Sequence, residues 1–329
     1  MIKNFIKLTI ASALVYWLVK NDKLDFTLII KSLQNPKTYF LSFVLILSQC
    51  AINAIRWKLI LATQTKEKIS SFFIIMVNWI GMFFNTALPG AVSGDLVKMI
   101  YINQIDEKIT KTSMFMTVLM DRVYGLIALI LITGLVSLSR LQYLMAINDN
   151  ISKIIKGNMF LLLGIFLFIS TLFAPKSIQD KIDLLFKKIP KIGNQISHIV
   201  ECFWALGREK VVFYKSIGLS LIGQSLGLTA FYILSSPYIG QQLQVIDIFT
   251  FVPLGMMITA IPLAPGGMGV GHIAFDQLFS YLNVSNGADL FNLFWVTMLC
   301  INLLGVIPYM VLGRKKKLNS TESEKLSEI

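Results

Sequence analysis

Pro265-Gly266-Gly267-Met268-Gly269 interrupts the otherwise apolar region 245–283, and Pro89-Gly90-Ala91-Val92-Ser93-Gly94 interrupts an earlier apolar region that begins near residue 70. Proline disrupts helices, and glycine permits sharp turns. Each break therefore predicts a helical hairpin. In the first half of the chain its arms are 70–88 and about 94–108, and in the second half the first arm is 245–264.

Basic residues around these hairpins indicate the side from which each one enters. The stretch 174–215 contains eight basic residues and 314–317 contains four, whereas 216–313 contains none. Cytoplasmic loops carry an excess of Lys and Arg, and the runs 211–235 and 290–313 provide two crossings between these segments. The second hairpin must then enter and leave on the outer side. Lysines flank the first hairpin, which places its ends in the cytoplasm: Lys66, Lys68, Lys108 and Lys111. Whether the hairpins are re-entrant or cross fully stays open.

The composition identifies lipid as the main solvent of the chain. Of 329 residues, 55% are apolar and 15% charged, against about 25% charged in a soluble domain, which excludes a soluble enzyme. A transmembrane helix needs about 20 apolar residues, and such runs occur at 4–20, 38–56, 112–135, 157–174, 211–235 and 290–313. We expect an all-α polytopic membrane protein with about six full spans and two Pro/Gly-broken hairpins related as inverted repeats.

The domain organisation follows from these spans. We expect one transmembrane domain, 1–313, with halves of about 1–140 and 157–313, amphipathic cytoplasmic interfacial helices at 176–206, and a basic, polar cytoplasmic tail at 314–329. Both termini are expected in the cytoplasm and the protein in the bacterial inner membrane. The net charge of +12 is interpreted as a topology signal, not as nucleic-acid binding. Three separated cysteines and two histidines predict neither a disulfide framework nor a metal site, and no cofactor is expected.

The first hairpin tip contains several candidate ligands of a lipid headgroup. Glycines allow close backbone approach, and free amides at a helix start attract anions. Asp95 and Lys98, three residues apart, share one helix face. Lys98 is expected to meet a phosphate, with Asp95 either contacting an amine of the headgroup or ordering Lys98. An interfacial salt bridge with Lys98 reaching to water explains the pair too. The candidates are Asn85, Pro89, Gly90, Gly94, Asp95 and Lys98.

Asp121 and Arg122 are charged residues inside an apolar run, and such residues are functional candidates by default. Neighbouring helical residues point about 100° apart, so each is expected to find its partner elsewhere. Three interpretations stay open. Arg122 holds a lipid phosphate, the pair changes partners during transport, or the two residues form a buried ionic staple between helices.

The second tip contributes Pro265, Gly266, Gly267, Gly269, His272 and Asp276. Its glycines resemble a nucleotide-binding loop, but no strand–helix–strand context surrounds them, so that interpretation is rejected. His272 is expected to titrate or to donate to a headgroup, and the alternative is a satisfied polar residue in a packed turn. A contact between His272 and Asp276, which share a helix face, is expected. Asp247 is expected to cap a helix. Polar residues in the spans either line a groove or bond between helices: Gln49, Asn53, Gln224 and Asn302.

Three blocks of sequence together resemble the lysylphosphatidylglycerol synthase transmembrane family. Residues 85–98 are similar to its N-x-x-L-P-G…G-[ED]-x-x-R segment, 120–126 to its D-R-x-x-G-L, and 265–270 to its P-G-G-x-G-V. The resemblance covers roughly 5–313. It implies a polytopic inner-membrane protein, like the flippase half of bacterial multipeptide-resistance proteins, that moves an anionic or zwitterionic lipid between leaflets.

Three positions depart from the family pattern. Lys98 stands where Arg is usual, Ser93 where Gly is common, and His272 near a position often occupied by Glu. Arg binds phosphate through two N–H groups and Lys does not, so these departures bear on headgroup choice. The aminoacyl-transferase domain of fused members does not occur in the sequence, so synthase activity is not carried over.

Three functions remain as hypotheses, with lipid translocation, and not enzymatic activity, as the leading one. Its expected partner is a membrane lipid substrate, and a second copy of the chain or a lipid-synthesis enzyme is left open. The second hypothesis is a transferase that acts on a lipid-linked donor, with Asp22 and Asp25 supplying the carboxylate. The third is a non-catalytic accessory subunit of a lipid-synthesis complex.

Overall fold

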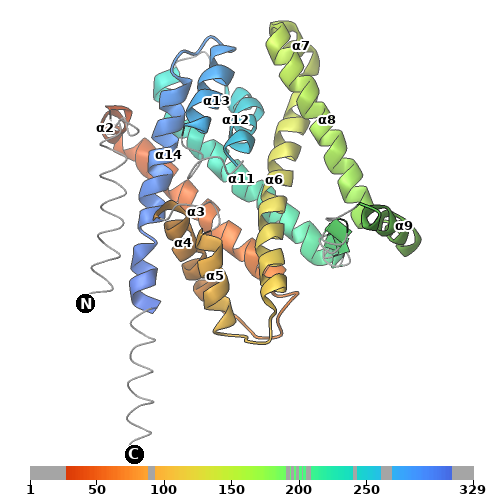
Figure 1. Ribbon diagram of the computed structural model, residues 1–329. Coiled ribbons are helices and arrows are strands. Elements are labelled where there is room, and N and C mark those ends of the chain that lie inside the picture. The colour runs from red at the N-terminus through yellow and green to blue at the C-terminus, as the bar shows by residue number, and fades with distance from the viewer. Residues whose placement is uncertain are drawn as a thin grey trace, which may run out of the picture.

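The computed structural model describes residues 27–87, 93–189, 193, 196–197, 200–201, 203–204, 209–239, 243–260 and 269–312. The elements in these ranges are α-helices (Figure 1). They are α2 (Thr27–Leu33), α3 (Pro36–Leu61), α4 (Ser71–Ala87), α5 (Ser93–Asn103), α6 (Lys111–Ser139), α7 (Leu141–Ile147), α8 (Asp149–Leu172), α9 (Lys176–Lys187), α11 (Lys210–Ile239), α12 (Val245–Thr259), α13 (Val270–Ser280) and α14 (Gly287–Leu303). The expected first span, Asp22, Asp25 and the basic tail lie outside the described residues.

Five helical segments are long and apolar enough to cross a bilayer: α3, α6, α8, α11 and the segment Gly287–Leu312, which begins with α14. Together with the two shorter apolar helices α4 and α12, they confirm the expected all-α polytopic architecture. One boundary differs, because α8 begins at Asp149 and not near 157. The Asn148 side chain accepts a hydrogen bond from the Ile151 amide at 2.8 Å, which caps the helix eight residues before its apolar run.

The two broken regions form hairpins that enter the bundle from opposite ends. In Figure 1 the α4–α5 pair is open toward the bottom of the view and the α12–α13 pair toward the top. The second arms, α5 and α13, have 11 residues each, or about 16 Å of helix. A bilayer core is about 30 Å thick, so neither second arm is long enough to cross it by itself, which favours re-entrant hairpins.

The two halves of the chain exchange contacts in a reciprocal way. Helices α3 and α11 pack along each other through the middle of the molecule, while α12 packs on α6 and α4 packs on α14. Each hairpin's first arm thus rests on the last long helix of the other half. In both places a side chain bonds a backbone carbonyl: Trp79 Nε1 donates to Ile301 at 2.7 Å, and Thr133 Oγ1 donates to Thr250 at 2.7 Å.

Small residues allow the helices of the first hairpin to touch. A Cβ added to Gly94 would lie 1.8 Å from the carbonyl oxygen of Gly81. Because that atom belongs to the backbone, α4 and α5 can pack at this distance only without a side chain at Gly94. This contact places the start of α5, and with it Asp95, against the wall formed by α4.

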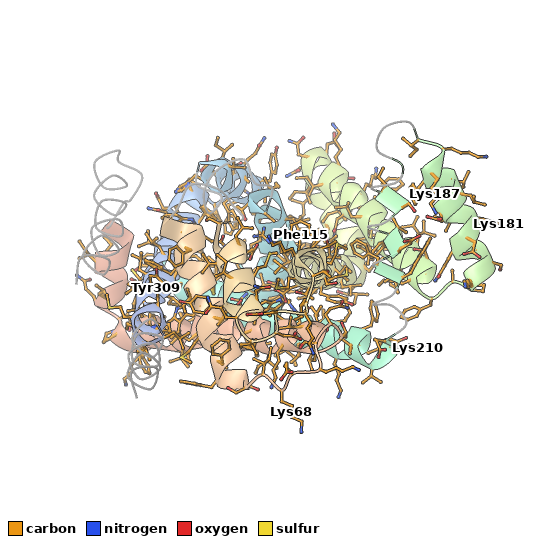
Figure 2. All side chains as sticks on the ribbon, turned by 60° about the horizontal axis from the view of Figure 1, so that its bottom comes forward. Lys68, Phe115, Lys181, Lys187, Lys210 and Tyr309 are labelled. Carbon is orange, nitrogen blue, oxygen red and sulfur yellow. The ribbon has the colours of Figure 1, made fainter. Side chains whose placement is uncertain are left out.

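Helix α9 forms within the stretch expected to lie on the membrane interface. Its apolar Ile178 and Leu185 are exposed, whereas Lys181 and Lys187 project away from the bundle, as does Lys68 beside the first hairpin (Figure 2). Lys187 pairs with Asp183 at 2.6 Å. The rest of the expected interfacial stretch, up to 206, is described only in part.

Candidate functional site

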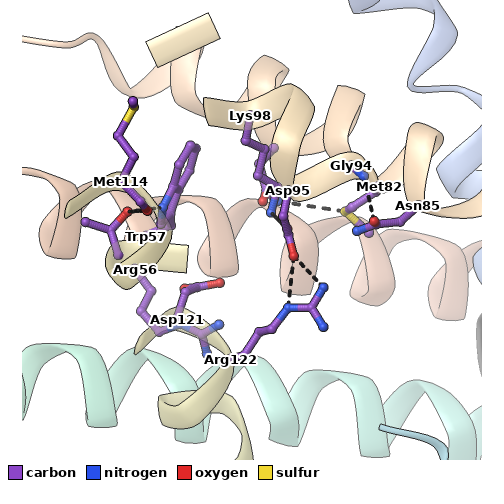
Figure 3. A network of polar contacts seen from close by, with 12 residues as sticks. Arg56, Trp57, Met82, Asn85, Gly94, Asp95, Lys98, Met114, Asp121 and Arg122 are labelled. Carbon is purple, nitrogen blue, oxygen red and sulfur yellow. Dashed lines mark hydrogen bonds and ion pairs between the residues drawn. The ribbon is translucent and has the colours of Figure 1, made fainter. Parts of the chain in front are cut away.

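The centre of the candidate site is the Asp121-Arg122 pair on α6. The helix begins after Thr110, whose hydroxyl accepts a hydrogen bond from the Ser113 amide at 3.1 Å, and it continues without a break to Ser139. Arg122 therefore lies about 17 Å from the start of the helix, deep within an apolar span. As expected for neighbouring helical residues, the two side chains diverge and meet partners on different helices (Figure 3).

Asp121 pairs with Arg56 of α3. Arg56 Nε donates to Asp121 Oδ1 at 2.7 Å, and Arg56 Nη1 donates to Ser220 Oγ of α11 at 2.9 Å. The Arg56 side chain is 5% exposed and that of Asp121 14% exposed. This buried contact ties three long helices together, so Asp121 acts as the ionic staple that the sequence offered as one alternative.

Arg122 turns to the other side and meets the first hairpin. Its Nε donates to Asp95 Oδ2 at 3.0 Å, and its Nη2 donates to the same oxygen. Lys98 Nζ lies 3.4 Å from Asp95 Oδ1. The Asp95 side chain is only 5% exposed, but that of Arg122 is 46% exposed. Arg122 therefore presents part of a charged guanidinium outside the protein interior, in the middle of a span.

Lys98 does not reach to the water interface. Its side chain is 9% exposed, and its Nζ lies 5.4 Å from the centre of the Trp57 ring. Trp57 in turn donates from Nε1 to Thr117 Oγ1 at 3.3 Å. The ammonium is thus held between a carboxylate and an aromatic face, and the alternative of an interfacial lysine is wrong.

Two hydrogen bonds join the last turn of α4 to the first residues of α5. Asn85 Oδ1 accepts a hydrogen bond from the Gly94 amide at 2.7 Å, and Ser93 Oγ donates to the Phe84 carbonyl at 3.1 Å. Asn85 therefore satisfies an amide at the start of α5, an amide that the sequence assigned to an anion. Pro89 and Gly90 lie outside the described residues.

In the second hairpin, the structure describes the chain again from Gly269, at the start of α13. Pro265, Gly266 and Gly267 lie outside the described residues. Gly269 has φ of 76°, a backbone conformation that favours glycine.

Its amide donates to His272 Nδ1 at 3.3 Å, and the His272 ring packs edge-on against Phe291 with centroids 5.0 Å apart. Within the described residues, the expected contact between His272 and Asp276 is not made, because Nδ1 turns back to Gly269 and Asp276 is exposed. Helix α13 packs mainly on α12 and α14, whereas α3, α5 and α6 hold the charged cluster.

Asp247 joins the base of the second hairpin to α6. Its Oδ2 accepts the Gln244 amide at 2.9 Å, which confirms its expected capping role at the start of α12. Its Oδ1 accepts from Arg140 Nη1 at 2.6 Å. Arg140 follows the last residue of α6, so this helix is bound to both hairpins, at its middle and at its end.

The polar residues of the spans serve mainly helix packing. Gln224 Nε2 donates to the Gly125 carbonyl at 3.3 Å, and Asn302 Nδ2 donates to Thr86 Oγ1 at 3.1 Å. Gln49 and Asn53 contact Gly227 and Gly223 at the close approach of α3 and α11. Interhelical hydrogen bonding, the second of the two interpretations, therefore accounts for Gln224 and Asn302, whereas Gln49 Oε1 is buried without a hydrogen-bond partner in the described part of the chain.

Comparison with known proteins agrees with this architecture. The family described as the lysylphosphatidylglycerol synthase TM region matches residues 4–313. The chain is also 26% identical over 299 residues to the UPF0104 membrane protein of Pyrococcus horikoshii, with 82% of this chain and 84% of that protein covered. No solved structure matches the chain. Since the family match extends over nearly the whole sequence, this multi-pass membrane protein belongs to the lysylphosphatidylglycerol synthase transmembrane-region family.

Proposed function

We propose that the protein is a transporter, not an enzyme, which moves a lipid with a phosphate-bearing headgroup between the leaflets of the inner (cytoplasmic) membrane. The observation that carries this proposal is the position of Arg122. Its side chain is 46% exposed, yet it lies about 17 Å along a span that begins at Lys111.

A charged side chain at such a depth needs a polar surrounding. Placing an arginine at the centre of a transmembrane helix costs about 3 kcal/mol by insertion scales, and such residues face protein, water or a transported group. The Arg122 guanidinium is bonded to Asp95 and its side chain is 46% exposed. Guanidinium groups bind phosphate through parallel N–H donors, which favours a phosphate as the transported group.

The surrounding helices supply the parts that a lipid route requires. The first hairpin carries Asp95 and Lys98 to the middle of the bundle, and the second enters from the opposite end (Figure 1). Broken helices near the bilayer centre are a usual place for a transport site. In this proposal the headgroup passes Arg122 while the acyl chains stay in the bilayer, and transport is downhill or coupled to an ion gradient.

Leaflet exchange in reconstituted vesicles tests the proposal. Phospholipids with a fluorescent acyl chain are included, and a reductant that cannot cross the bilayer quenches only the outer leaflet. We expect the wild-type protein to bring the inner-leaflet lipid out, Arg122→Gln to abolish this exchange, and Arg122→Lys to keep a fraction, since lysine retains the charge but not the paired donors.

Lys187→Gln serves as the control, because Lys187 lies on α9 and pairs with Asp183 outside the cluster. It should exchange lipid at the wild-type rate. If wild-type vesicles match protein-free vesicles for anionic and zwitterionic phospholipids alike, the proposed function is wrong.

A further inference from the structure

A group of uncharged polar side chains is buried where α6, α8 and α12, the first arm of the second hairpin, meet. Thr133 and Ser137 lie one turn apart on α6 and are fully buried, and Asn158 of α8 is 2% exposed. Thr133 Oγ1 donates its hydrogen to the Thr250 carbonyl of α12 at 2.7 Å, so its lone pairs are left for other neighbours. The group lies about 16 Å along α6 from Arg122 and is therefore separate from the charged cluster.

The amide of Asn158 is poorly satisfied by the protein. Its Oδ1 is buried and has no hydrogen-bond partner among the described residues, which is costly for a polar atom. Its Nδ2 lies 3.5 Å from both Thr133 Oγ1 and Ser137 Oγ, whereas N–H···O bonds are usually about 2.9–3.0 Å long. A half-turn of the amide exchanges its oxygen and nitrogen and places three oxygens around one point.

The spacing of these three atoms matches the ligand shell of a cation. Ligand oxygens lie about 2.3–2.6 Å from Ca²⁺, and Na⁺ has nearly the same radius. Two such oxygens at right angles to each other are therefore about 3.3–3.7 Å apart. The distance of 3.5 Å from the Asn158 amide to each hydroxyl oxygen lies in this range. The larger K⁺ would require a wider spacing.

The charges near the group favour a monovalent ion. Oxygen sites for divalent ions usually include carboxylates, and the hydroxyl and amide ligands here are neutral. Arg140 and Asp247, about one turn away on α6 and α12, cancel each other as an ion pair. Na⁺ sites of transporters use backbone carbonyls of interrupted helices. Pro253 interrupts α12 and leaves the Phe249 carbonyl, next to Thr250, without its helical hydrogen bond.

We propose that Thr133, Ser137 and Asn158 bind a Na⁺ ion through their side-chain oxygens, with water completing its shell. The Thr250 carbonyl orients the site, because it takes the hydroxyl hydrogen of Thr133 and turns the lone pairs toward the ion. Coordination polarises the Thr133 hydroxyl and strengthens its bond to Thr250. The ion thereby holds the first arm of the second hairpin against α6.

Thermal unfolding of the full chain in detergent tests the site in NaCl, KCl and N-methylglucamine chloride at equal ionic strength. At ten times its Kd a ligand stabilises the folded state by RT ln 11. We therefore expect Na⁺ to raise the unfolding temperature by about 3–6 °C over N-methylglucamine, and K⁺ to have a much smaller effect. Equal unfolding temperatures in NaCl and N-methylglucamine chloride, or equal stabilisation by K⁺ and Na⁺, would overturn the assignment.

Variants locate the ion. Asn158→Leu and Ser137→Ala each remove one ligand oxygen and should abolish the Na⁺-dependent shift. Ser139→Ala is the matched control, because Ser139 is exposed on the same helix and bonds the Val136 carbonyl, and it should keep the shift. A full shift in Asn158→Leu would place the ion elsewhere and reject the site. Saturable binding of radioactive Na⁺ by the wild type does not depend on whether the variants fold, and its absence would equally reject the site.

A role of the ion in transport rests on the proposed function and is measured in vesicles with either Na⁺ or K⁺ on both sides. We expect phospholipid exchange to be slower in Na⁺, because the ion fastens α12, and Asn158→Leu to exchange at the same rate in both salts. Equal wild-type rates would overturn this role. Absence of exchange in both salts would reject the proposed function but not Na⁺ binding, which is measured without lipid transport.

Discussion

Gly94→Ala should displace the first hairpin from its charged partner. The added Cβ would lie 1.8 Å from the Gly81 carbonyl oxygen, and ordinary contact begins near 3.4 Å, so the backbones of α4 and α5 must separate by about 1.6 Å. Asp95 is the next residue, and its bond to Arg122 Nε is 3.0 Å long. A shift of this size takes the carboxylate beyond hydrogen-bond distance.

The expected loss of stability combines two opposing effects. Overpacking costs about 1–3 kcal/mol, and the upper end applies because both clashing groups are backbone. Alanine is about 1 kcal/mol better than glycine within a helix, which leaves a net loss of about 2 kcal/mol. At about 2–4 °C per kcal/mol, the unfolding temperature should fall by about 4–8 °C.

Thermal unfolding in detergent, followed by tryptophan fluorescence, measures the stability, and vesicle exchange of phosphatidylglycerol measures the function. We expect exchange by Gly94→Ala to fall about tenfold or more, since the Asp95 contact is lost. Gly157→Ala is the matched control, because a Cβ on Gly157 has nothing within 4 Å, and it should unfold at or slightly above the wild-type temperature. If Gly94→Ala has wild-type stability and exchange, the close packing of α4 on α5 does not position Asp95.

Arg56→Met should lower the free energy of unfolding by about 3 kcal/mol, because it leaves the buried Asp121 carboxylate without its cation; denaturant titration checks this, and a second substitution, Asp121→Leu, should restore most of the loss. Arg140→Gln breaks the ion pair with Asp247 of the second hairpin and should lower the free energy of unfolding by about 1 kcal/mol. A decrease below a few tenths of a kcal/mol in the same titration would show that this ion pair does not contribute to stability. The pKa of Asp106, in the loop before α6, is lowered chiefly by the hydrogen bond from Thr65. The ionised Asp106 therefore contributes stability at pH values above the ordinary pKa of an aspartate, and this contribution is lost as the pH falls through the lowered pKa. Thr65→Val should raise the pKa of Asp106, and the NMR shift of its carboxyl carbon in labelled protein, followed against pH, measures this change.

Local signals in the sequence predict the hairpins well but their extent less well. Proline and glycine mark the breaks, and the second arm of the first hairpin is expected to reach about 108. It ends at Asn103, because Asp106 forms a turn instead. Its Oδ1 accepts the Lys108 amide at 3.0 Å, and its Oδ2 accepts the Thr65 hydroxyl at 2.6 Å. The second bond joins residues 41 positions apart, which no local pattern reveals.

The sequence likewise predicts only part of the charged cluster. Helix geometry predicts that Asp121 and Arg122 need separate partners, and Asp95 was among the candidates. Arg56 was missed, because it stands beside Trp57 and Lys58 near the end of a span and resembles an interface anchor. It lies 65 residues from Asp121 in the sequence. Only the packing of α3 on α6 brings them together.

Helix α6 is joined by ion pairs to both hairpins, and this double attachment affects how the two hairpins can move. Arg122 lies within α6 and Arg140 directly follows its last residue, about 27 Å further along the helix axis, and each pairs with a different hairpin. Rotation of α6 about its axis would strain both ion pairs at once. Breaking the ion pair to one hairpin would therefore change the free energy needed to break the ion pair to the other hairpin. In the proposed transport, α6 would therefore link the movement of one hairpin to that of the other without direct contact between them.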